Sequence, residues 1–148
     1  AVLKALQARM RKLTEASISI AAQAGQFRAA IVQAETAAKT TSNEEAAAKR
    51  DNDRLLGEAK ALREYIDGLV RGGEAPALIA ALQEEFGDLE SKQREAAQQI
   101  ERIKSRSNAI GQSLVISRAE LEATEEKHRQ AADQAMKLRE HIEKEAHT

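Results

Sequence analysis

An uninterrupted heptad pattern limits this chain to long paired helices. Apolar residues recur at alternating steps of three and four along two runs, residues 3–69 and 79–145, which we call the seam. Of the 40 seam positions 30 are apolar, whereas the apolar fraction of the whole chain, 42%, predicts about 17. A three–four step that never slips over this length predicts coiled-coil helices.

The composition fits a thin core between two helices and not an ordinary globular one. Charged residues make up 32% of the chain and aromatic residues 2%, with one proline and no tryptophan. Globular cores draw much of their buried area from aromatic side chains, whereas coiled coils are rich in Ala, Glu, Lys, Leu and Arg. We therefore expect a narrow aliphatic seam.

One cluster of helix-breaking residues lies close to the midpoint, at residues 71–76. Gly72 and Gly73 suit the end of a helix, and Pro76 suits the first turn of the next, where its missing N–H has no partner to lose. The sequence thus predicts a first helical arm over residues 1–70, a turn over 71–76 and a second arm over 77–148.

The two runs of the seam match each other in one antiparallel register, in which the numbers of facing residues add to 148. In this register Leu69 faces Ile79 and Leu62 faces Phe86. Because large residues often face small ones along both arms, the register favours close packing. The predicted fold class is all-α, a long antiparallel two-helix coiled-coil hairpin.

Two weakly helical stretches, residues 40–45 and 105–111, lie at the same height in this register. Ser42 and Glu45 have the spacing of a capping box, which is typical of a helix start. The stretches predict either an elbow in both arms or a continuous seam with a poorly packed polar layer.

Four polar residues occupy seam positions where leucine is expected: Glu45, Asn52, Gln93 and His128. Such residues commonly fix the register of paired helices at a cost in stability. His128, opposite Ile20, is compatible with a pH switch or with a histidine at the edge of the seam.

No catalytic, cofactor-binding or metal-binding constellation is found in the sequence. Gly72 and Gly73 lack the neighbouring Lys and Ser of a phosphate-binding loop. His141 and Glu145 share a helix face, but no third metal ligand accompanies them. We expect no catalytic residue, no cofactor and no metal, and so no enzyme.

Charge and cysteine content limit the expected partners and compartment. The net charge is −1, and residues 39–106 hold 12 Lys and Arg against 14 Asp and Glu, which speaks against direct nucleic-acid contact. We expect no membrane span, because no apolar run approaches 18 residues. The absence of cysteine and of a signal-peptide pattern predicts a cytoplasmic location.

A second apolar stripe beside the seam is the predicted interaction surface. By the register, its residues on the two arms would form one patch on the same side of the hairpin. Small side chains would let another helix approach closely, although alanine is also chosen for helix propensity alone. The stripe comprises Ile18, Ala22, Gly25, Ala29, Val32, Ile116, Ala119 and Ala123.

These features predict a non-enzymatic structural or protein-interaction module, a helical hairpin that acts as a spacer, arm or oligomerisation element. Its expected partner is a second copy, giving a homodimer, or a helix of another protein. The alternative is a coiled-coil arm segment of a DNA-handling or ATP-driven machine.

Overall fold

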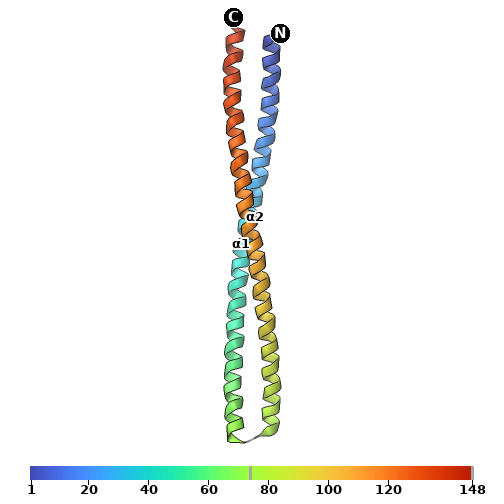
Figure 1. Ribbon diagram of the computed structural model, residues 1–148, viewed down its shortest axis with the longest axis vertical. Coiled ribbons are helices and arrows are strands. Elements are labelled where there is room, and N and C mark those ends of the chain that lie inside the picture. The colour runs from blue at the N-terminus through green and yellow to red at the C-terminus, as the bar shows by residue number, and fades with distance from the viewer. Residues whose placement is uncertain (74, 148) are drawn as a thin grey trace. The chain divides into compact units, whose positions relative to one another are not determined.

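The computed structural model describes residues 1–73 and 75–147, which form two long helices (Figure 1). Helix α1 spans Val2–Gly72 and helix α2 spans Pro76–Ala146. The predicted all-α helical hairpin is confirmed, while supercoiling of the helices stays a prediction. Glu74 of the predicted turn and Thr148 of the second arm lie outside the described residues.

The chain divides into two units that are described separately. The terminal unit pairs Ala1–Thr36 with Gly111–Thr148, and the turn unit comprises Ala37–Ile110. Each unit therefore takes one part of α1 and one part of α2.

In the terminal unit, the covered side of each helix is the predicted seam. Ile31 and Leu114 are among its buried residues. On one flank of the seam Arg28 pairs with Glu125, at 3.2 Å between Nη2 and Oε1. Both residues lie one position after a seam residue, and the numbers of the pair add to 153, within one heptad of the predicted 148.

The turn unit is built in the same way, with Leu55 and Ile103 among its buried residues. Arg106 pairs with Glu44 across the two helices at 3.3 Å. The guanidinium carbon of Arg63 lies 5.9 Å from the ring centre of Phe86, the residue predicted to face Leu62.

Burial follows the seam closely in both units. Of the predicted seam residues, only Glu145 is exposed; every other one is buried or half-buried. Among the described residues outside the seam, only Ala8, Ala37 and Glu125 are similarly covered. The three–four step therefore identifies the surface that each helix presents to its partner.

Two residues beside the turn adopt the left-handed backbone region. Gly73 has φ of 66° and Ala75 has φ of 51°. The Gly73 N–H donates to the Val70 carbonyl at 3.1 Å, and the Ile79 N–H donates to the Ala75 carbonyl at 3.0 Å. Gly72 ends α1 and Pro76 begins α2. An N–H in the first turn of a helix has no partner within that helix, so the N–H that proline lacks costs no hydrogen bond here.

Some polar side chains of the seam have hydrogen-bond or ion-pair partners, and one buried oxygen has none. The buried hydroxyls of Thr41 and Thr124 each donate to a carbonyl four residues earlier, at 2.7 Å. The carboxylate of Glu45 pairs with Lys49 at 3.2 Å. Asn52 keeps a buried Oδ1 with no hydrogen-bond partner, and His128 is half-buried.

The two stretches predicted to weaken the arms, 40–45 and 105–111, are helical throughout. A bend of the helix axis at these stretches stays a prediction. Neither described helix contains a segment long and apolar enough to cross a bilayer.

Candidate interaction surfaces

All eight residues of the predicted second stripe are exposed. The largest are the most open, with Ile18 at 67%, Val32 at 61% and Ile116 at 57% of their full surface. Nothing lies within 4 Å of the place that a Cβ on Gly25 would occupy. The hairpin itself therefore does not cover the stripe.

The α1 part of the stripe borders a flank marked by two interhelical ion pairs. Arg28 pairs with Glu125, and Arg118 pairs with Glu35 at 3.3 Å. Val32 stands four residues after Arg28 and three before Glu35, one helical turn from each. The α1 row of small and apolar residues thus runs alongside these charges.

The α2 part of the stripe faces another direction. Ile116 is two residues from Arg118, and Ala123 is two residues from Glu125, a separation of about 200° around a helix. Both therefore point away from the flank that carries the ion pairs. The eight residues form two separate rows and not the single patch that the sequence pattern predicted; binding by either row stays a prediction.

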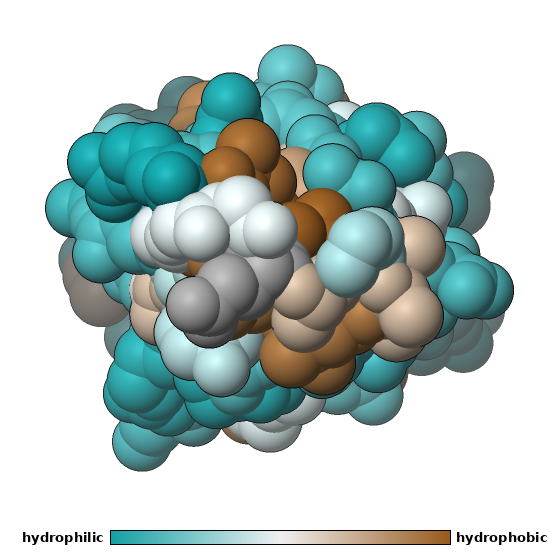
Figure 2. Space-filling view, turned by 90° about the horizontal axis from the view of Figure 1, so that it is seen from below, coloured by the Kyte–Doolittle hydropathy of each residue, from teal (hydrophilic) through white to brown (hydrophobic). Residues whose placement is uncertain are grey.

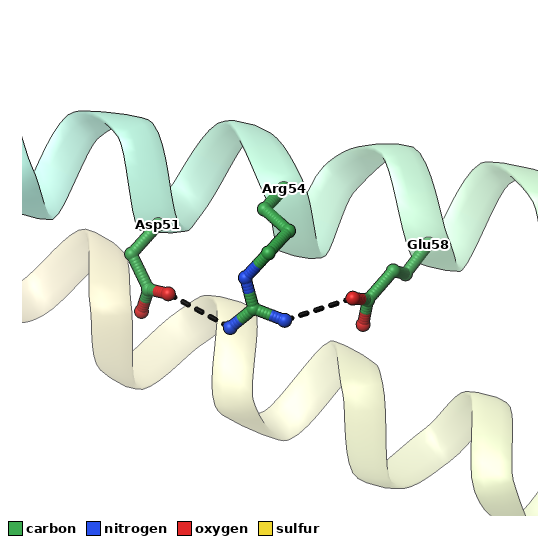
Figure 3. A network of polar contacts seen from close by, with 3 residues as sticks. All are labelled: Asp51, Arg54 and Glu58. Atoms are coloured by element: carbon green, nitrogen blue, oxygen red, sulfur yellow. Dashed lines mark hydrogen bonds and ion pairs between the residues drawn. The ribbon is translucent and has the colours of Figure 1, made fainter.

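Asp51, Arg54 and Glu58 form a polar network on α1 (Figure 3). Arg54 donates to Asp51 and Glu58 at 2.8 Å each, and all three residues come from one helix. Hydrogen bonds to Asp51 and then to Glu58 raise the pKa of the solvent-exposed Arg54 guanidinium. A raised pKa stabilises the folded state at any pH below the ordinary pKa of arginine. This stabilisation is lost only as the pH rises through the raised pKa. The network belongs to a solvated helix surface and offers no unusual proton donor near neutral pH.

Arg129 shows the same behaviour on α2. Its pKa is raised first by a hydrogen bond to Glu126 and then by the charge of that carboxylate. Within residues 1–73 and 75–147, no three His, Cys, Asp or Glu side chains are grouped closely enough to hold a metal ion.

An apolar groove with basic edges lies between the helices of the terminal unit. Leu6, Leu13 and Leu138 contribute its apolar lining, and the groove encloses about 540 Å³. Among the described residues, the groove has no acidic lining residue, and its remaining lining includes Arg9, Lys12, Lys137 and His141. We call this the basic groove.

Hydrophobic side chains are also exposed at the end of the turn unit, which Figure 2 views directly. Val70 is 54% exposed, Leu78 is 44% exposed, and Tyr65 nearby on α1 is 56% exposed. Residues 75–82 contain no polar side chain, so the first two turns of α2 are apolar on every face. A helix that is apolar all round is normally covered by something.

Sequence reasoning missed both the basic groove and the apolar turn end. The groove is formed by residues beside the seam from two segments that are far apart in the sequence. It could therefore be recognised only once the structure showed these segments side by side. The turn end had a local signal, the apolar run 75–82, which the heptad pattern obscured because Ile79 and Leu82 belong to the seam.

The chain was compared with known proteins on both sequence and structure. It matches no known protein family, no curated protein and no solved structure.

Proposed function

We propose that the chain is a non-enzymatic protein-interaction module, a helical hairpin that binds a helical partner or a second copy of itself through the α1 row. This row consists of Ile18, Ala22, Gly25, Ala29 and Val32. The observation that carries the proposal is the exposure of Ile18 and Val32, at 67% and 61%, on a helix whose seam is already occupied by α2. Burying such residues against a partner removes apolar surface from water.

The residue sizes in the row suit a close helix–helix contact. Gly25 and Ala29 lie between the two larger residues and leave room for a second helix to approach. Twofold pairing is the commonest way in which identical chains associate, so a homodimer is the simplest assembly that would cover the row.

Replacing Ala29 with Glu tests the proposal, because a buried charge in the contact is strongly unfavourable whereas an exposed Glu is a good helix former. Light scattering of the native chain should give a mass above the 16.2 kDa of one chain, and Ala29→Glu should reduce it. The matched control is Ala46→Glu, at an exposed alanine outside the row, which should leave the mass unchanged.

A native chain that stays monomeric at high concentration would contradict the homodimer. It would favour the alternative, an arm segment of a DNA-handling or ATP-driven machine whose partner is a different protein. An assembly that Ala29→Glu leaves intact would place the contact elsewhere on the hairpin.

A further inference from the structure

Charge is unevenly distributed between the two ends of the hairpin sequence. Residues 1–14 hold four Lys and Arg and no Asp or Glu, whereas residues 72–91 hold five Asp and Glu and no Lys or Arg. The opposite charges of these two segments are not apparent from the net charge of the whole chain, which is −1. The basic segment contributes to the basic groove, and the acidic segment begins α2 at the turn end.

The basic groove carries cationic side chains with few internal partners. Arg9 and Lys12 line it and form no ion pair with any described residue. Lys137 pairs with Asp133, four residues earlier on α2, at 3.1 Å, and both side chains are well exposed. An exposed pair of this kind contributes little to stability, so Lys137 is available to a better-placed carboxylate.

The turn end presents the complementary surface. Leu78, Ala81, Glu85 and Asp88 follow steps of three and four and so share one face of α2. Leu78 is exposed, and both carboxylates are exposed without an ion-pair partner among the described residues. An apolar side chain followed by two carboxylates matches a groove with an apolar lining and basic edges.

We infer that the basic groove of one copy binds the turn end of a second copy. Leu78 of the incoming chain would enter the apolar part of the groove, while its Glu85 and Asp88 would meet Arg9, Lys12 and Lys137. Because the two surfaces differ, the contact is heterologous: the copy whose groove is filled still has a free turn end, and the other copy still has a free groove. This pairing uses no residue of the α1 row, so it and the proposed function can fail independently.

The experiment compares four chains in an Ala29→Glu background, which removes the α1-row contact. The first carries no further change, the second carries Arg9→Glu and Lys137→Glu, and the third carries Glu85→Lys and Asp88→Lys. The fourth, a control, carries Asp53→Lys and Glu120→Lys, which make the same charge change as the third at exposed positions away from both surfaces. Helix content by circular dichroism shows that each chain is folded.

We expect the first and fourth chains to self-associate in sedimentation velocity, with a mass that rises with concentration. The second and third chains should each associate more weakly by roughly tenfold or more, because like charges face each other in the contact. Mixing these two should restore association, since each retains the surface that the other has lost.

Absence of self-association in the first chain would overturn the inference. Loss of association in the second chain but not in the third would also overturn it, because the occupant of the groove would then not be the turn end. A mixture of the second and third chains that remains monomeric would contradict a heterologous contact.

Discussion

Backbone conformation at the turn predicts opposite effects for two neighbouring glycines. Gly73 has a positive φ, whereas Gly72 is the last residue of α1. A left-handed conformation costs a residue with a Cβ roughly 1–2 kcal/mol, while replacing any glycine by alanine stabilises by about 0.4–1 kcal/mol through the unfolded chain. Gly73→Ala should therefore destabilise the hairpin by about 1 kcal/mol, and Gly72→Ala should not.

Ala75 provides the reciprocal test, because it holds a φ of 51° with a side chain in place. Ala75→Gly should relieve this strain and leave the hairpin as stable or more stable, even though glycine has the more flexible unfolded state. Thermal unfolding followed by circular dichroism measures all three variants, and about 1 kcal/mol corresponds to a shift of roughly 2–4 °C at this chain length. The reasoning is refuted if Gly73→Ala and Gly72→Ala have the same effect, or if Ala75→Gly destabilises by as much as Gly73→Ala.

Three further predictions concern the helices. Asn52→Leu should stabilise the turn unit by roughly 1–2 kcal/mol because it removes a buried oxygen that has no partner; a lower denaturant midpoint would contradict this. Gly57→Ala should stabilise by about 0.5–1 kcal/mol, since Gly57 is exposed in mid-helix with open space around it, and an unchanged midpoint would count against the helix assignment there. A bend at residues 40–45 and 105–111 predicts faster amide exchange there than in residues 20–34; uniform protection would argue for unbent helices.

The sequence predicted the hairpin because two independent signals agreed. The three–four step determined which side of each helix is covered, and Gly73 with Pro76 determined where the chain reverses. Both signals are local, so they can be recognised without knowing the tertiary structure. The interhelical pairs Arg28–Glu125 and Arg106–Glu44 show that the helices also meet close to the predicted register.

The interaction surfaces were harder to predict because they depend on rotation around the helix axis. The stripe residues were identified correctly as lying outside the seam, but their direction was not. Ile116 and Val32 are close in the register along the hairpin, yet Ile116 lies on the side of α2 away from Arg118. The register determines where a residue lies along the axis of the helix pair. Which residues share a surface depends also on the angle of each residue around its own helix.

The pairing of the two helices within one chain is the claim on which every surface described above depends, and cysteine cross-linking tests it most directly. Leu62→Cys with Phe86→Cys places two thiols opposite each other in the seam of the turn unit, where Arg63 already lies over the Phe86 ring. As a control, Leu62→Cys with Ile100→Cys displaces the second thiol by two heptads, about 21 Å along the helix. Under mild oxidation the first pair should form a disulfide within the monomer and the control pair should not. Cross-linking of the control pair alone, or of the first pair only between chains, would contradict the hairpin register.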